Sequence, residues 1–68
     1  MVNTNELKAK IVSKGMTQQE VAKALNMSSK TFGLRMKKGV FGSDEIDKLI
    51  EILDIQQPMP IFFAQLVT

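Results

Sequence analysis

The chain has 68 residues, 44% of them hydrophobic, a formal net charge of +2, and neither cysteine nor histidine. This length indicates one domain, residues 1–68, that buries roughly 60% of the surface of its unfolded chain; the missing residue types exclude disulfides and argue against a zinc site. Because the N-terminal stretch lacks an apolar run typical of a signal peptide, and no segment reaches the ~20 apolar residues of a membrane span, we expect a cytoplasmic protein.

The first predicted element is a helix that begins at a cap, Thr4 or Asn5, and runs to about Lys14. Leu7 and Ile11 are spaced i and i+4, which places both side chains on one face of this helix, toward the core. The first three residues of the chain precede the cap, and we expect them to be frayed.

A second, shorter helix is predicted to begin at Thr17. Gly15 is suited to end the first helix, and Thr17 with Glu20 forms a capping box, in which two side chains satisfy free backbone N–H groups. The buried stripe of the second helix consists of Val21, Ala22 and Leu25. Asn26 follows directly, and asparagine tolerates the left-handed backbone that ends a helix sharply. A tight corner is therefore expected here, and a small residue such as Ala22 permits the close crossing of two helices.

The third helix is predicted to follow this corner, with Met27 filling the corner and Ser28 or Ser29 as the cap. Phe32 and Met36 are spaced i and i+4 and are its predicted core side chains. The opposite face consists of Ser28, Ser29, Lys30, Gly33, Leu34 and Lys37. We interpret this carboxylate-free face as a surface for double-stranded DNA.

The residue types of that face suit the major groove. A lysine such as Lys30 donates to the O6/N7 edge of guanine, Leu34 is suited to the methyl group of thymine, and Gly33 permits a close approach. Ordinary solvated lysines are the alternative reading. The charge distribution favours DNA, because residues 23–38 hold five Lys or Arg and no acid, whereas residues 44–54 hold five acids and one lysine. The expected phosphate contacts are Lys14, Lys23, Lys37 and Lys38.

Two glycines flank Phe41 in the next loop, and we expect this ring to fold back as a plug under the helix pair. A fourth helix, about Ser43 to Leu53, follows with Ser43 as its cap. Its apolar stripe consists of Ile46, Leu49, Ile50 and Leu53. Its acidic residues are expected to form a solvated outer face.

The C-terminal segment follows a short linker, residues 55–57. Pro60 suits the first turn of a last short helix, from Pro60 to about Leu66, although the same residues are β-prone and a strand is the alternative. Residues 61–67 include five large apolar side chains, and one short helix cannot bury all of them on one side of so small a domain. We therefore predict a dimer or partner surface consisting of Ile61, Phe62, Phe63 and Leu66; the alternative is that the tail simply closes the core.

The pattern T-Q-x-E-V-A…L-x-M-S…T-F resembles the helix-turn-helix domain of the phage repressor and Cro group, the XRE-type regulators. K-T-F before a Gly-Phe loop, D-E-I-x-K-L, and P-x-P-I-F-F-A are similar to small phage and prophage regulators of Gram-positive bacteria. The likeness covers about residues 4–66. It implies an all-α, five-helix, lambda-repressor-like domain whose third helix lies in the major groove, usually as a homodimer on an operator.

The resemblance also assigns individual positions. Gln18 matches the glutamine that opens the second helix and touches a phosphate, and Thr17 beside it is suited to the same contact. The family's corner glycine is Asn26 here. The position of a Trp or Leu late in the third helix is Arg35, which we expect to extend along the core edge to a phosphate or to an acid of the fourth helix.

These observations favour a sequence-specific transcriptional regulator, Cro-like or repressor-like, of a phage or prophage genetic switch. The alternative is a protein-binding modulator or antirepressor that docks on a larger phage repressor through the apolar C-terminal tail. An enzyme is not expected, because the chain lacks His, Cys, Tyr and Trp and shows no convergent carboxylates. No cofactor, metal or small-molecule substrate is implied.

Overall fold

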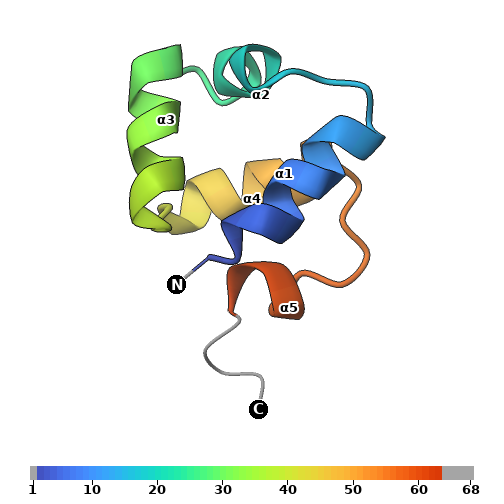
Figure 1. The fold of residues 1–68 in the computed structure, drawn as a ribbon. Coiled ribbons are helices and arrows are strands. Elements are labelled where there is room, and N and C mark those ends of the chain that lie inside the picture. The colour runs from blue at the N-terminus through green and yellow to red at the C-terminus, as the bar shows by residue number, and fades with distance from the viewer. Residues whose placement is uncertain (1, 64–68) are drawn as a thin grey trace.

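The computed structural model describes residues 2–63, and this part of the chain is an all-α domain of five helices. In chain order they are α1 (Thr4–Ser13), α2 (Gln18–Ala24), α3 (Ser29–Lys38), α4 (Ser43–Ile52) and α5 (Met59–Phe62). Figure 1 shows α2 and α3 meeting at a corner, with α3 at the edge of the molecule. The predicted all-α, five-helix fold class is confirmed. None of these helices is both long and apolar enough to span a membrane.

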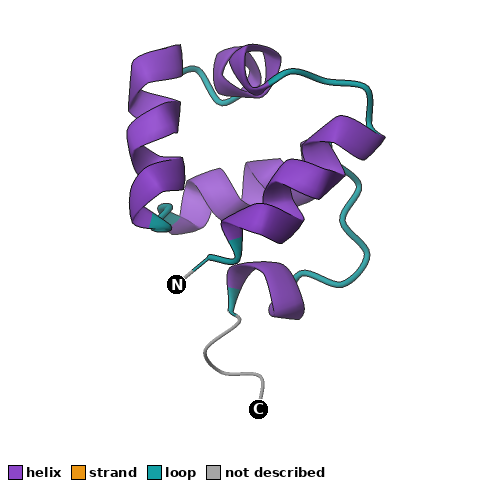
Figure 2. Ribbon diagram, viewed as in Figure 1, coloured by secondary structure: helices purple, strands orange, loops and turns teal. Residues whose placement is uncertain are grey.

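The helices are joined by loops of a few residues (Figure 2). α2 packs on α3 and α4, and α1 packs on α5. Two of the predicted helix starts are confirmed in atomic detail. Thr17 Oγ1 accepts from the N–H of Glu20 at 3.1 Å, and Glu20 Oε1 accepts from the N–H of Thr17 at 2.9 Å, which completes the capping box. Ser28 caps α3 by accepting from the N–H of Thr31 at 3.1 Å. These bonds join residues three apart, so local sequence is sufficient to specify them.

The caps of two other helices differ from the prediction. Asn3, rather than Thr4 or Asn5, caps α1, and its Oδ1 accepts from the N–H of Glu6 at 3.2 Å. Gly42, rather than Ser43, is the N-cap of α4, and its N–H donates to Glu45 Oε1 at 2.8 Å. The caps therefore precede the predicted cap residues, although α4 itself begins at Ser43, as predicted.

The last helix also differs from the predicted element over residues 60–66. It begins at Met59, one residue before Pro60, and ends at Phe62. The proline lies in the first turn, where its missing N–H has no intrahelical partner to lose. Residues 59–62 are helical, so the strand alternative is wrong for this stretch; Leu66 lies outside the described residues.

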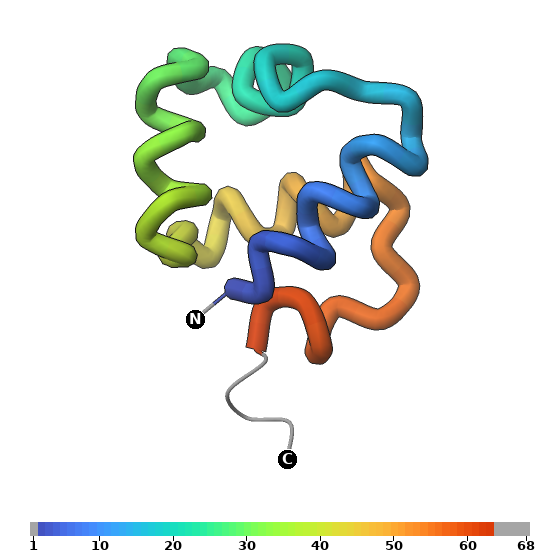
Figure 3. Tube along the Cα trace, viewed as in Figure 1, coloured from blue at the N-terminus to red at the C-terminus, as the bar shows by residue number. Residues whose placement is uncertain are grey.

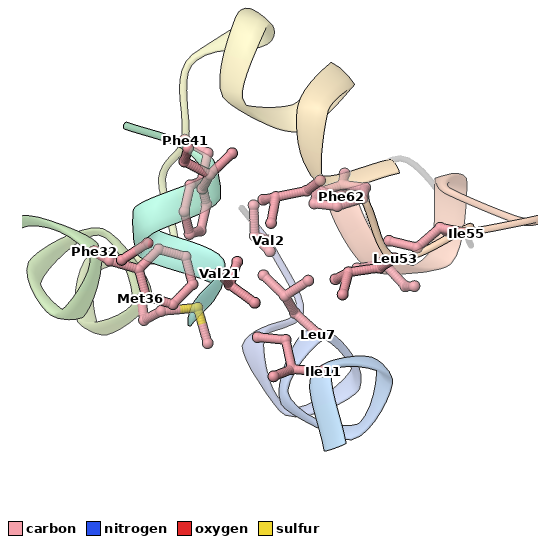
Figure 4. Packing of buried hydrophobic residues seen from close by; sticks show 14 residues of the cluster. Val2, Leu7, Ile11, Val21, Phe32, Met36, Phe41, Leu53, Ile55 and Phe62 are labelled. Carbon is pink, nitrogen blue, oxygen red and sulfur yellow. The ribbon is translucent and has the colours of Figure 1, made fainter. Parts of the chain in front are cut away.

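The core is one cluster of apolar side chains drawn from every helix and from the loops between them (Figure 4). Phe41 is buried, and its ring centroid lies 5.8 Å from that of Phe32 at an interplanar angle of 54°. This tilted arrangement is typical of favourable aromatic pairs. The predicted plug under the helix pair is confirmed. Ile55, which sequence reasoning placed in a linker, is also a buried member of the cluster.

The N-terminal segment is not frayed at Val2 and Asn3, contrary to the prediction. Val2 is 8% exposed, and its N–H donates to the carbonyl of Gly39 at 2.8 Å. The N–H of Asn3 donates to the carbonyl of Ile61 at 2.6 Å. Figure 3 traces this segment between the end of α3 and α5. Two backbone hydrogen bonds to distant segments and an apolar anchor therefore hold it in place.

The predicted partner surface divides into buried and exposed parts. Ile61 is 4% exposed and Phe62 is 3% exposed, so within the monomer both side chains close the core. Phe63 is 37% exposed. Ile61 and Phe62 are therefore core residues of the folded chain, and a surface formed by them would not be accessible. Phe63 stays accessible.

Candidate nucleic-acid interface

The corner between α2 and α3 sets the direction of α3. Asn26 adopts a left-handed backbone with φ 60°, as predicted, and reverses the chain immediately after α2. The N–H of Met27 donates to the carbonyl of Ala22 at 3.0 Å, which closes the corner. Ala22 is 1% exposed where the two helices pack, so a larger side chain would push them apart. The corner is therefore held by backbone geometry as well as by apolar packing.

Phe32 and Met36 anchor α3 to the core. Their exposed fractions are 1% and 6%, and their i, i+4 spacing puts both on one side of the helix. The positions of the predicted surface on this helix are all exposed: Ser29, Lys30, Gly33, Leu34 and Lys37. We call these five positions the α3 face. Lys38, a predicted phosphate contact, is also exposed at the end of the helix.

Three of the predicted contact residues lie at the starts of α2 and α3. Thr17, Gln18 and Ser28 are exposed, at the starts of α2 and α3. Two of them act as helix caps: Thr17 Oγ1 accepts from Glu20, and Ser28 Oγ accepts from the N–H of Thr31 while donating to Thr31 Oγ1 at 2.9 Å. Ser28 therefore has its hydroxyl proton engaged within the molecule, which reduces its capacity to donate to a base.

Leu34 is the apolar member of the α3 face. It is 51% exposed, so a large part of its side chain contacts water in the monomer. Burying apolar area is favourable by about 25 cal/mol per Å². A partner with a methyl group at this point would therefore gain affinity from it.

Arg35 extends toward α4 and away from the α3 face. Its Nε lies 3.0 Å from Oε2 of Glu45, so the guanidinium pairs with an acid in the first turn of α4. This is one of the two positions expected for Arg35, the other being a phosphate. The cations on the α3 face are therefore lysines.

Lys14, the fourth predicted phosphate contact, lies away from the α3 face. Its Nζ lies 3.8 Å from Oδ2 of Asp54, which follows α4. In Figure 1 the C-terminal end of α1 and α3 lie on opposite sides of the molecule. A ligand on the α3 face would have to reach around the domain to touch Lys14.

A shallow hollow lies beside the α2–α3 corner, next to the α3 face. The residues that line it are Gln19, Lys23, Asn26, Met27, Ser28 and Ser29. Gln19 was missed by sequence reasoning, although its i, i+4 spacing to Lys23 places both on one face of α2. Amide and ammonium donors here suit a phosphate oxygen. Gln18, the predicted phosphate contact, is not among the residues lining this hollow.

The α3 face has the chemistry of a surface that binds a polyanion. Lysine side chains supply donors and positive charge, and α3 itself carries no acidic residue. A helix of ten residues is about 15 Å long, and the B-DNA major groove admits an α-helix. Within residues 2–63, no group of three or more carboxylates gathers into a site for a metal ion.

Comparisons with known proteins identify a family for this chain. The chain shows no significant similarity to a curated protein or to a solved structure. One family model, described as "Protein of unknown function (DUF739)", matches residues 2–65. The match spans all five described helices, including the α3 face and α5. The chain therefore belongs to the DUF739 family.

Proposed function

We propose that this protein is a sequence-specific DNA-binding transcriptional regulator, Cro-like or repressor-like, in a phage or prophage genetic switch. The observation that carries the proposal is the α3 face: a helix anchored through Phe32 and Met36 presents an exposed surface with lysines, one apolar side chain and no acid. Such a surface matches the negative phosphates and the base edges of a duplex. The proposed working species is a homodimer on a palindromic operator in the cytoplasm.

In the proposed complex, α3 enters the major groove. Lys30 and Leu34 lie on the accessible face. Lys30 would donate to the acceptor edge of a guanine, and Leu34 would pack on the methyl group of a thymine. Lys23, Lys37 and Lys38 would contact phosphates on the flanking strands. The side chains of Gln18 and Gln19 at the start of α2 would add amide donors to the same backbone.

The proposal implies modest specificity. The α3 face contains neither arginine nor glutamine for two-bond recognition of a base, and Arg35 is held by Glu45. Much of the affinity would then come from phosphates. With about three phosphates neutralised per monomer, by Lys23, Lys37 and Lys38, log K should fall with log salt at a slope of roughly −3 per monomer, doubled for a dimer.

The test is selection of bound duplexes from a random pool at fixed, moderate salt. Enrichment of one palindrome supports both sequence recognition and a two-fold complex. Lys30→Glu should abolish binding to the selected duplex, whereas the matched control Lys48→Glu, a charge reversal at an exposed position on α4, should change affinity much less. Equal binding of all duplexes by the unaltered protein would overturn the proposal.

A second candidate function rests on a different surface. A hollow near the C-terminal end of the described chain is lined by Val2, Gly39, Val40, Phe41, Ile46, Phe62 and Phe63. Val40 is 60% exposed and Phe63 is 37% exposed, so its rim is apolar and accessible. This favours a protein-binding modulator or antirepressor that docks on a larger phage repressor. Co-purification with such a repressor, lost in Phe63→Asp and kept in Lys30→Glu, would support this function over the first.

A further inference from the structure

Gly33 occupies an unusual position for glycine. It lies in the interior of the ten-residue helix α3 and is exposed to solvent. Glycine in a helix interior is less favourable than alanine, because its backbone loses more conformational freedom on folding. The fold therefore loses stability at this position, and a compensating advantage must lie elsewhere.

The interior of the molecule does not supply that advantage. Gly15 and Gly39 adopt left-handed backbone with φ 69° and 70°, which favours glycine, whereas Gly33 has helical backbone. A Cβ atom built on Gly33 would meet no heavy atom within 4 Å, apart from its chain neighbours and the backbone of its own helix. An alanine would therefore fit without displacing anything. The missing side chain matters only to something that approaches from outside.

Because glycine has no side chain, Gly33 leaves a gap between the side chains of its neighbours on α3. Ser29 and Lys37 lie one turn before and one turn after it on the same side of α3, and Lys30 and Leu34 flank it. All four are exposed, so the glycine lies within the α3 face, between Ser29 and Lys37. A flat partner that contacts both Lys30 and Lys37 passes between Gly33 and Leu34.

The length of Leu34 adds a geometric constraint. A leucine side chain is shorter than a lysine side chain, so it reaches a base edge only if the helix backbone lies close to the groove floor. A side chain at position 33 would fill the space beside Leu34 that a base-pair edge would otherwise occupy. The gap at Gly33 and the short apolar side chain of Leu34 beside it therefore suit a complex in which α3 lies close against base-pair edges.

We propose that Gly33 is a specificity-determining residue, the point at which the backbone of α3 lies against base-pair edges in the major groove. This inference rests on the proposed function and deepens it. Gly33 has no side chain with which to form a hydrogen bond to a base. It allows Lys30 and Leu34 to reach the bases, so its replacement should weaken binding to the operator more than binding to random duplex.

The experiment compares the unaltered protein with Gly33→Ala and Gly33→Leu on the selected duplex and on a random duplex. Gly33→Ala should unfold at a temperature about 2–8 °C higher, because alanine favours the helix. Its affinity for the selected duplex should nevertheless fall at least about fivefold, the lower end of what one base contact contributes, and Gly33→Leu should lose more. Affinity for random duplex should change less than twofold.

Ala9→Leu is the matched control, since Ala9 is an exposed position in α1 outside the α3 face. It adds three carbons to a helix surface, against four in Gly33→Leu, and should leave both affinities unchanged. If the unaltered protein prefers one duplex and Gly33→Ala keeps that preference, the Gly33 inference alone is overturned. A lower unfolding temperature for Gly33→Ala would also overturn it, because the glycine would then serve the fold. If the unaltered protein prefers no duplex over another, both the proposed function and the Gly33 inference are overturned.

Discussion

The Nε atom of Arg35 lies 3.0 Å from Oε2 of Glu45, and this ion pair ties the C-terminal half of α3 to the first turn of α4. Glu45 also makes a hydrogen bond, in which its Oε1 accepts from the N–H of Gly42 at 2.8 Å. One carboxylate therefore caps α4 and positions α3. It also withdraws the only arginine of the chain from the α3 face.

Substitution can separate the two interactions of Glu45, the ion pair with Arg35 and the hydrogen bond from Gly42. Glu45→Gln keeps an oxygen for Gly42 but removes the charge, and should lower the free energy of unfolding by about 0.2–1 kcal/mol, as expected for a partly exposed pair. Glu45→Ala removes both bonds and should lower it by about 1–2 kcal/mol. Urea denaturation followed by circular dichroism measures both values. Equal losses in the two variants would show that the bond to Gly42 contributes nothing.

Arg35→Met tests whether this cation also touches DNA. Methionine keeps an apolar stem along the core edge and removes the charge. Since the guanidinium is paired with Glu45, we expect the slope of log K against log salt to stay unchanged. A slope that is less negative by about one would mean that Arg35 leaves Glu45 and neutralises a phosphate in the complex.

Leu34 should read a thymine methyl group. Replacing thymidine by deoxyuridine at the contacted position removes that methyl group and should weaken binding of the unaltered protein about fourfold, from roughly 0.8 kcal/mol per buried carbon. Leu34→Ala should bind both duplexes with equal affinity, because the partner of the methyl group is gone. Fluorescence anisotropy with the four combinations measures the coupling. The same loss in both proteins would exclude this contact.

Val2 should anchor the N-terminal segment. Val2→Asp places a carboxylate in the core and should lower the free energy of unfolding by about 2–4 kcal/mol. Val12 provides a matched control, since it is 74% exposed where Val2 is 8% exposed. Val12→Asp should change stability by less than about 0.5 kcal/mol. Similar losses in thermal melts of the two variants would contradict the anchoring of Val2.

The adjacent phenylalanines of the C-terminal segment should have separate roles. Phe62→Ala opens a cavity in the core and should destabilise the protein by about 3–5 kcal/mol. Phe63→Ala should change stability by about 1 kcal/mol or less, because Phe63 is 37% exposed. If the apolar hollow is an interface, Phe63→Asp should weaken self-association or partner binding without unfolding. Sedimentation velocity with circular dichroism distinguishes these outcomes, and loss of fold in Phe63→Asp would contradict the exposed position of the ring.

Apart from the burial of Phe41 under the helix pair, the features predicted correctly from the sequence are those decided over three or four residues. The Thr17–Glu20 capping box, the left-handed turn at Asn26 and the paired burial of Phe32 and Met36 all depend on neighbours along the chain. Their physical causes are hydrogen bonds to free helix ends, backbone conformational preference and the 3.6-residue period. The composition of the α3 face followed from the same periodicity.

Only the tertiary structure decided the relations between distant residues. Val2 lies against Gly39, Lys14 lies beside Asp54, and neither relation leaves a pattern in the sequence. The sequence also could not assign Phe62 to the core and Phe63 to the surface, because that assignment depends on how α5 is oriented against α1. Local hydrogen bonding and periodicity determine which segments become helices and which faces are apolar. The burial of each particular side chain depends on packing that every helix shares.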